Sequence, residues 1–158
     1  MKPSPHRYSV RLAGGPTGDA ELFADNRPGL LSAPPAEYDG PGDEWSPEHL
    51  LLAAVQSCLL FTFRAVARNS KVEFSSIDIE TEGTVDRQDG VTRFTRIVVH
   101  PMLVVPAGTD SARVLAALQK AEKHCLVSAS LSTPIHMEPE IIQADLPAPR
   151  TVVSVSSA

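Results

Sequence analysis

The sequence is poor in the features that mark several specialised classes of protein. Of its 158 residues only two are cysteine and one is tryptophan, and aromatic residues make up 5%. The formal net charge is −5, and the chain has neither a basic stripe nor an aromatic-rich strand. Such a composition does not fit a protein that binds nucleic acid. We therefore expect no nucleic acid among the partners of this chain.

The sequence also has little of the apolar material that directs a chain to a membrane. Its first ten residues, MKPSPHRYSV, lack the apolar core of a signal peptide. The longest apolar run, residues 50–63, is shorter than the about 20 residues that a membrane-spanning helix needs. We therefore expect a cytoplasmic protein with no membrane partner. Its length is enough for one domain with its own core.

The two cysteines, Cys58 and Cys125, are scarce but reactive residues. In a reducing compartment they are not expected to form a permanent disulfide bond. One interpretation is that both are small buried apolar residues that never react. The other interpretation is that they form a redox pair. Their spacing in the sequence does not decide between these two.

What the sequence does contain is a long apolar helix at residues 46–68, SPEHLLLAAVQSCLLFTFRAVAR. Ser46 is predicted as the N-cap and Pro47 as the first helical residue, while Glu48 places a carboxylate in the first turn. Beyond that turn nearly every face is apolar, and a helix that is apolar all round is normally buried on all sides. Cys58 lies in the middle of this helix.

The rest of the sequence predicts two hairpins, a second helix and a last strand. Two short strands flank a glycine-rich turn near the start, and a proline-rich loop then leads into the apolar helix. A long antiparallel hairpin follows, in which Pro101 requires an edge position or a bulge. The predicted segments are strands at residues 8–12, 20–24, 72–85, 92–105 and 135–142, a brief strand at 30–31, a helix break after residue 68, a helix from Asp110 or Ser111 to about residue 124, and a tail at 143–158.

These elements predict an α+β fold in which an antiparallel sheet packs around the long buried helix, with residues 1–142 as a single domain. One sheet covers only one side of a helix. Because this helix requires cover on all sides, a second copy of the chain is expected to supply the rest, and we predict a homodimer. The alternative is a compact monomer with both helices packed on one sheet.

A cysteine acts as a nucleophile only as the thiolate, which burial in an apolar helix disfavours. Cys58 is about three turns into its helix, where the positive end of the helix dipole no longer acts. Its activation therefore requires a cation from another segment. The candidates are Arg27 in the proline-rich loop, Arg11 on the first strand and His124. Glu48 is the natural carboxylate to hold such an arginine.

Cys125 follows the end of the second helix and is expected to start another helical turn, a position that favours a thiolate. If the fold brings Cys125 to Cys58, the pair can cycle between a dithiol and a disulfide. A peroxide oxidises one sulfur to a sulfenic acid, and the other sulfur condenses with it.

Two blocks of sequence carry a family resemblance. The first is SPEHLL at residues 46–51, followed by Ala53-Ala54 and Ser57-Cys58, and the second is AEKHCLVS at residues 121–128. Together with the spacing of the two cysteines, they resemble the OsmC/Ohr family over about residues 8–140. The resemblance implies an intertwined homodimer whose central helices are wrapped by sheets, with active sites at the subunit interface.

The resemblance also implies thiol-dependent reduction of organic hydroperoxides. Cys58 would be the peroxidatic thiol, Cys125 the resolving thiol and Glu48 the carboxylate that anchors an arginine. An external dithiol reductant, lipoyl-type in the best-understood branch of the family, would recycle the pair with no metal or bound organic cofactor. The apolar helix beside the thiol suits a hydrophobic alkyl or lipid hydroperoxide as the substrate.

The chain departs from the family at the activating arginine. In one branch this arginine follows a pair of glycines, where Pro16 stands here, and in the other it lies about ten positions before the glutamate, where Tyr38 stands. Arg27 is the candidate to replace it. Leu126 also takes the place of the usual proline after the second cysteine. Two alternatives to a peroxidase therefore stay open: a non-catalytic redox-sensing dimer, and a binder of small apolar ligands with inert thiols.

Overall fold

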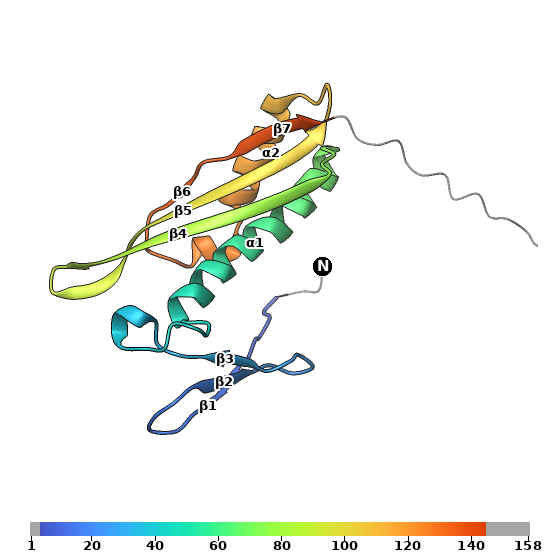
Figure 1. Ribbon diagram of the computed structural model, residues 1–158. Coiled ribbons are helices and arrows are strands. Elements are labelled where there is room, and N and C mark those ends of the chain that lie inside the picture. The colour runs from blue at the N-terminus through green and yellow to red at the C-terminus, as the bar shows by residue number, and fades with distance from the viewer. Residues whose placement is uncertain (1–3, 145–158) are drawn as a thin grey trace, which may run out of the picture. The chain divides into compact units, whose positions relative to one another are not determined.

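The computed structural model describes residues 4–144, and the part of the predicted tail at residues 145–158 lies outside them. Contacts between residues divide the chain into two units, one up to Ala53 and one from Ala54 onward. The long helix α1 begins in the first unit and continues in the second. Figure 1 shows the elements of both units.

The first unit contains a small antiparallel sheet in the order β1-β2-β3. The predicted hairpin is confirmed, and the brief third strand joins it, so that Leu22 pairs with Leu12 on one side and with Leu30 on the other. The first strand begins later than predicted, at Arg11. The elements are β1 (Arg11–Ala13), β2 (Ala20–Phe23), β3 (Leu30–Ser32) and the 3-10 helix η1 (Ala36–Tyr38).

The predicted apolar helix is α1 (Pro47–Ser70), and it begins where the sequence predicts. The hydroxyl of the fully buried Ser46 accepts a hydrogen bond from the backbone N–H of His49 at 3.3 Å, as expected of an N-cap. The helix continues past the predicted break after residue 68. It ends at Ser70 because Lys71 adopts a left-handed backbone conformation with a φ of 53°.

By length and composition alone, α1 also meets the criteria for a helix that crosses a membrane. The mean hydropathy of its most apolar window is 1.8, and 28% of that window is buried. The core helix of a soluble protein meets the same criteria. Much of the apolar surface of α1 therefore remains uncovered by the residues that the structure describes.

The second unit contains a four-stranded sheet in which the long strand β5 has neighbours on both sides. The predicted hairpin of β4 and β5 is confirmed, and it turns at Asp89-Gly90, where both residues have positive φ as a tight turn requires. β6 and β7 pair with the other side of β5 in parallel, so this sheet is mixed. The elements are β4 (Ser76–Gln88), β5 (Val91–Pro106), α2 (Ser111–Lys123), α3 (Leu126–Ala129), β6 (Ile135–Met137) and β7 (Glu140–Ala144).

Pro101 lies at the point where β6 gives way to β7. The prediction that it requires an edge strand or a bulge is wrong, because β5 is central and the bulge in β5 falls at Thr95, between the pairs Thr84–Arg96 and Val85–Phe94. Pairing with β6 stops at Val99 and pairing with β7 starts at Met102. Pro101 has no backbone N–H to donate. It lies in the interval of β5 that pairs with neither β6 nor β7, so no hydrogen bond to these strands is lost.

The predicted last strand is therefore two short strands, and the second of them continues beyond the predicted boundary. β7 ends at Ala144, so residues 143 and 144 belong to the sheet and not to a tail. The side chain of Gln143 accepts a hydrogen bond from the backbone N–H of Gly108 at 2.9 Å. This contact fastens the last strand to the loop before α2.

The core of the second unit lies between its sheet and the two helices that cover one face of that sheet, α1 from Ala54 onward and α2 (Figure 1). Alternate residues of β5 point to this face. The largest buried side chains include Ile97, Val99, Leu103 and Val105 of β5, Val55 and Phe63 of α1, and Val114 and Leu118 of α2.

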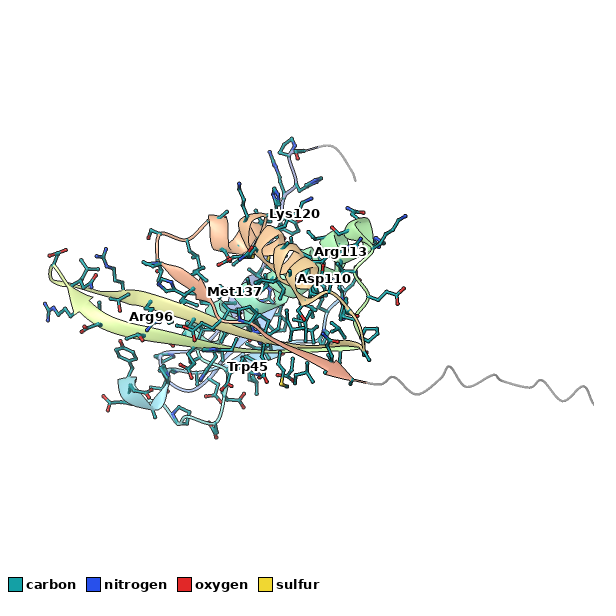
Figure 2. All side chains as sticks on the ribbon, turned by 90° about the horizontal axis from the view of Figure 1, so that it is seen from above. Trp45, Arg96, Asp110, Arg113, Lys120 and Met137 are labelled. Carbon is teal, nitrogen blue, oxygen red and sulfur yellow. The ribbon has the colours of Figure 1, made fainter. Side chains whose placement is uncertain are left out.

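The helix α2 is held at its beginning by two contacts, and Figure 2 labels Asp110 and Arg113 there. Asp110 is the N-cap, as one of the two predicted candidates, and its Oδ1 accepts a hydrogen bond from the backbone N–H of Ala112 at 2.9 Å. The guanidinium of Arg113 donates to the backbone carbonyl of Ser70. The start of α2 is thereby joined to the end of α1. This contact helps to fix the position of α2 and of the short helix α3 that follows it.

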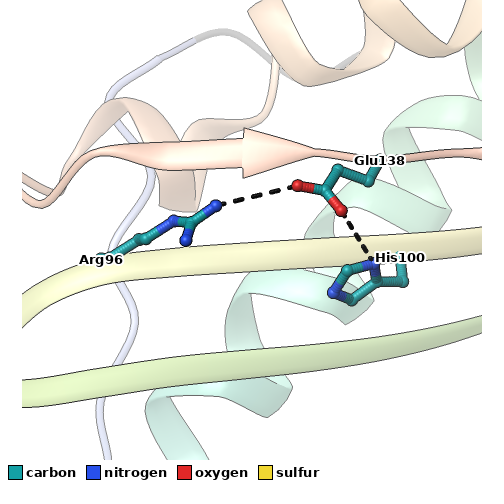
Figure 3. Close-up of polar contacts among 3 residues, drawn as sticks. All are labelled: Arg96, His100 and Glu138. Carbon is teal, nitrogen blue, oxygen red and sulfur yellow. Dashed lines mark ion pairs between the residues drawn. The ribbon is translucent and has the colours of Figure 1, made fainter.

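The other face of the sheet carries polar side chains. Arg96 and His100, on the opposite face of β5 from Ile97 and Val99, both lie near Glu138, which links β6 to β7 (Figure 3). The distances are 3.8 Å from Arg96 Nη2 to Glu138 Oε1 and 3.7 Å from His100 Nδ1 to Glu138 Oε2. Because these groups are largely exposed, such pairs contribute little to stability.

Candidate active site

The two cysteines lie on separate elements of the second unit. Cys58 is in the middle of α1, close to the buried residues Val55 and Leu59, and is itself half-buried. Cys125 follows the end of α2 and is the N-cap of the short helix α3, so the helical turn predicted there is present. Its exposed fraction is 1%. Of the two thiols, Cys58 is therefore the more accessible.

The fold brings these two thiols together across 67 positions of sequence. The Cys58 thiol lies close enough to Cys125 to raise the pKa of the Cys125 thiol. In addition, the backbone N–H of Val127 in α3 donates to Cys58 Sγ at 3.5 Å. Two thiols in contact are the arrangement that a dithiol–disulfide cycle requires.

Ser128 supplies a second donor to the thiol pair. Its hydroxyl donates to Cys125 Sγ at 3.1 Å. Burial raises the pKa of the Cys125 thiol, hydrogen bonds from the side chain and backbone of Ser128 lower it, and the neighbouring Cys58 raises it. The outcome is a pKa above the ordinary value of 9.0, so at neutral pH the Cys125 sulfur is protonated.

Sequence reasoning did not single out the two donors, Val127 and Ser128. Almost every residue type has a backbone N–H, so the sequence does not show which one will donate to a thiol. Val127 donates because α3 lies beside α1. Ser128 did offer a signal. It is the last residue of the AEKHCLVS block and lies three positions after Cys125, where a hydroxyl in the first turn of a helix can reach back to the N-cap.

Glu48 lies in the first turn of α1, within the first unit, as predicted. Its Oε2 atom is buried and has no hydrogen-bond partner among residues 4–144. Burial of a carboxylate oxygen without a donor destabilises the folded state, because the hydrogen bonds to water are lost and no hydrogen bond within the protein replaces them. The position of Glu48 is therefore that of a group that requires a donor or a cation.

A cavity of about 380 Å³ in the first unit adjoins Glu48. Apolar side chains form much of its wall, among them Leu12, Ala33 and Pro35, while Tyr38 and Glu48 are polar members of the lining. Tyr38 stands where one branch of the family has its arginine. The cavity is thus lined both by Glu48, whose Oε2 atom has no partner among the described residues, and by Tyr38.

Arg27, the predicted source of that cation, is exposed on the first unit. Its guanidinium donates to the backbone carbonyl of Asp25. Arg11 lies over the ring of Phe23, with its guanidinium carbon 4.3 Å from the ring centroid. Across the described residues, neither arginine forms an ion pair with Glu48. The activating role of Arg27 stays a prediction.

No group of three or more His, Cys, Asp or Glu side chains is placed to hold a metal ion in the part of the chain that the structure describes. His124, the third candidate cation, is the C-cap of α2 and is exposed. The second unit thus contains two neighbouring thiols with two hydrogen-bond donors. The first unit contains, separately, a carboxylate beside a partly apolar cavity.

Comparison with known protein families identifies the family of this chain. A family model described as OsmC-like protein matches residues 40–140, a range that includes Glu48, Cys58 and Cys125 but not Arg27. The chain belongs to the OsmC-like protein family. The resemblance found in the two sequence blocks is thereby confirmed.

Relatives of this OsmC-like protein share its sequence or its fold. The uncharacterised protein YmaD of Bacillus subtilis (strain 168) is 30% identical over 109 residues, which cover 67% of this chain and 73% of that one. An OsmC-like protein of unknown function from Vibrio cholerae has a solved structure that superposes with a TM-score of 0.78 at 17% identity, covering 85% of this chain and 99% of that one.

One further solved structure has a similar fold. It is an organic hydroperoxide resistance protein from Legionella pneumophila, with a TM-score of 0.70 at 20% identity, covering 89% of this chain and 99% of that one. At these identities the likeness establishes the fold. The predicted α+β fold with a long central helix is therefore confirmed.

Proposed function

We propose that this OsmC-like protein is a thiol-dependent peroxidase that reduces organic hydroperoxides. The observation that supports the proposal most directly is that α3, which begins at the N-cap Cys125, donates the backbone N–H of Val127 to Cys58 Sγ at 3.5 Å, so the two thiols are neighbours. Cys58 is assigned as the peroxidatic thiol because it is half-buried and a peroxide has access to it, whereas Cys125 is 1% exposed. Cys125 is then the resolving thiol.

The proposed reaction oxidises the two thiols and reduces the peroxide. The Cys58 thiolate attacks the distal oxygen of the hydroperoxide, the O–O bond breaks, and the alkoxide leaves and takes a proton to become the alcohol. Cys58 is now a sulfenic acid. The Cys125 thiol loses its proton as its sulfur attacks Cys58 Sγ, the S–O bond breaks, the leaving hydroxide takes a proton to become water, and a disulfide forms. An external dithiol, lipoyl-type by family resemblance, returns the pair to the reduced state without a metal or bound organic cofactor.

Activation of Cys58 is the demanding part of this proposal. The N–H of Val127 stabilises negative charge on Cys58 Sγ, but one backbone donor is weaker than a cation. We propose that Glu48 anchors a cationic group for the site, and Arg27 is the candidate from the sequence. Phe61, three positions after Cys58, and Leu126, the residue after Cys125, are large apolar side chains that are 62% and 66% exposed. Such side chains suit an alkyl or lipid hydroperoxide.

The same apolar surface supports a homodimer. A helix with a mean hydropathy of 1.8 over a window of which 28% is buried requires further cover, and a second copy supplies it without a membrane. We therefore propose a cytoplasmic homodimer in which one functional domain, predicted as residues 1–142, extends to the end of β7 at Ala144. The monomer alternative also placed both helices on one face of the sheet, as observed, but it leaves this surface bare.

The decisive experiment is a peroxide-consumption assay with cumene hydroperoxide and dihydrolipoate on wild type, Cys58→Ser and Cys125→Ser. Wild type should turn over many times, and Cys58→Ser should fall to the rate without protein. Cys125→Ser should consume about one equivalent and retain a sulfenic acid that a dimedone probe labels. Equal consumption by wild type and Cys58→Ser would contradict the proposal. One equivalent consumed by wild type, without turnover, would favour a redox sensor.

The cavity beside Glu48 favours a second candidate function, the binding of a small ligand with an apolar body and a cationic head. The apolar wall fits the body, and the buried Oε2 atom, which no described residue satisfies, fits the head. A charge-assisted hydrogen bond in such a place contributes enough for about a tenfold gain in affinity or more.

This second function is tested by titrating the protein with hexylammonium and with hexanol, observed by NMR. Hexylammonium should bind more tightly than hexanol, and Glu48→Gln should remove that difference while leaving the weaker binding of hexanol unchanged. Glu37→Gln, an exposed carboxylate on η1, is the matched control. Equal affinities for the two compounds in wild type would refute this function.

A further inference from the structure

We propose that Ser128 stabilises Cys125 as the leaving thiolate, so that the reductant opens the disulfide by attack on Cys58. This inference rests on the proposed dithiol–disulfide cycle and assigns its direction. In this proposal Ser128 contacts a reacting atom, Cys125 Sγ. Cys58 Sγ is the one sulfur that the reductant attacks.

The contact that carries the inference is the hydrogen bond from Ser128 Oγ to Cys125 Sγ at 3.1 Å. Ser130 in the same short segment shows the usual alternative, because its hydroxyl donates to the backbone carbonyl of Leu126 at 2.9 Å. Ser128 donates to a sulfur instead. A hydroxyl that donates to sulfur is more useful to a thiolate than to a thiol, because the charged acceptor forms the stronger hydrogen bond.

Cys125 needs such a donor because its surroundings oppose ionisation. It is 1% exposed, and burial raises the pKa of its thiol, as does the neighbouring Cys58. The hydroxyl and the backbone of Ser128 are the groups that act in the opposite direction. Without them the buried thiolate would form more slowly and would be a poorer leaving group.

Accessibility decides which sulfur the reductant attacks. Cys58 is half-buried and Cys125 is buried, so an external thiolate reaches Cys58 Sγ first. A bond forms between the reductant sulfur and Cys58 Sγ, the Cys58–Cys125 bond breaks, and its electron pair goes to Cys125 Sγ. Ser128 donates to that sulfur as the charge appears. The second thiolate of the dithiol then attacks the reductant's own sulfur and releases the Cys58 thiolate.

The direction of attack can be measured on the wild-type protein. The disulfide is formed with diamide, which requires no peroxide, and is then opened with glutathione, a monothiol whose mixed disulfide persists long enough to be trapped by acid. Peptide mass spectrometry should find glutathione on Cys58. An adduct on Cys125, or failure of diamide to form the disulfide, would overturn the inference.

The role of Ser128 is measured by comparing Ser128→Ala, Ser128→Thr and Ser130→Ala. Reduction of the diamide-formed disulfide by dithiothreitol should slow about tenfold in Ser128→Ala, because a hydrogen bond to a charged sulfur is lost. Ser128→Thr keeps the hydroxyl and should recover the rate. Ser130→Ala should match wild type. A rate for Ser128→Ala equal to that of Ser130→Ala would overturn the inference.

A pH profile separates this role from a merely structural one. The rate of Cys125 alkylation by iodoacetamide is measured against pH in Cys58→Ser and in the double variant that also carries Ser128→Ala. In the double variant the rate should reach half its maximum at a higher pH. The Ser130→Ala change should leave that pH unchanged. An unshifted profile for Ser128→Ala would contradict the inference. These measurements use no hydroperoxide, so the peroxidase proposal can fail while this one stands, and the reverse also holds.

Discussion

The Cys125 thiol shows how one residue can link chemistry to stability. Its burial completes the packing around the end of α2, and the same burial raises the pKa of the thiol. In the unfolded chain the thiol has its ordinary pKa, so above that value the unfolded state loses its proton before the folded state does. The contribution of this thiol to folding is thus fully present below about pH 9 and is lost as the pH rises through the folded pKa.

The free energy of unfolding of the wild type should therefore fall more steeply with pH above about 9 than that of Cys125→Ala. The difference in slope can reach at most about 1.4 kcal/mol per pH unit, the value for one proton. Urea denaturation at pH 8, 9 and 10 under a phosphine reductant, at one protein concentration, measures it. The variant will be less stable throughout because of the lost side chain, so the slopes are compared. Parallel slopes would contradict this account of the buried thiol.

Among the elements, those with strong local signals were predicted well. The start of α1 follows from Ser46, Pro47 and Glu48, whose side chains act within one turn, and the N-cap contact of Ser46 is present. The end of α1 was predicted too early because Asn69-Ser70 is a weak break. The helix continues until the backbone conformation of Lys71 stops it.

Elements that depend on distant neighbours were predicted less well. Pro101 reads as an edge residue, because nothing in β5 itself indicates that two short parallel strands will leave an interval opposite it. The contact of Cys58 with Cys125 likewise depends on where α2 delivers α3, which the Arg113 contact with Ser70 helps to fix. The candidate thiols were found from the sequence and its resemblance, whereas the donors around them required the fold.

For the whole molecule, the apolar surface left on α1 and α3 is the feature with the largest consequence. Phe61 and Leu126 are 62% and 66% exposed, and they flank the thiol pair in sequence. Two large apolar side chains at one site point to cover by a partner. If that partner is a second copy, oligomeric state and access to the thiols are linked.

Wild type should therefore behave in solution as a particle of about twice the chain mass of 16.9 kDa, as measured by light scattering during gel filtration. Phe61→Asp and Leu126→Asp place a charge on the apolar surface and should shift the protein toward monomer by costing several kcal/mol at a buried interface. Gln119→Asp, on the exposed side of α2, introduces the same charge elsewhere and should leave the mass unchanged. A monomeric wild type, or three dimeric variants, would refute the homodimer.

The order in which β5 finds its neighbours has a consequence for synthesis on the ribosome. β5 can pair with β4 as soon as both are synthesised, because a tight turn joins them. The other side of β5 pairs with β6 and β7, which are synthesised only after α2 and α3. Until residue 144 has emerged, a nascent chain presents a long strand with one open edge, the arrangement most prone to pair with a neighbouring chain. Chains that stop before residue 135 should thus aggregate during translation, so the closing of this edge is also a checkpoint for quality control.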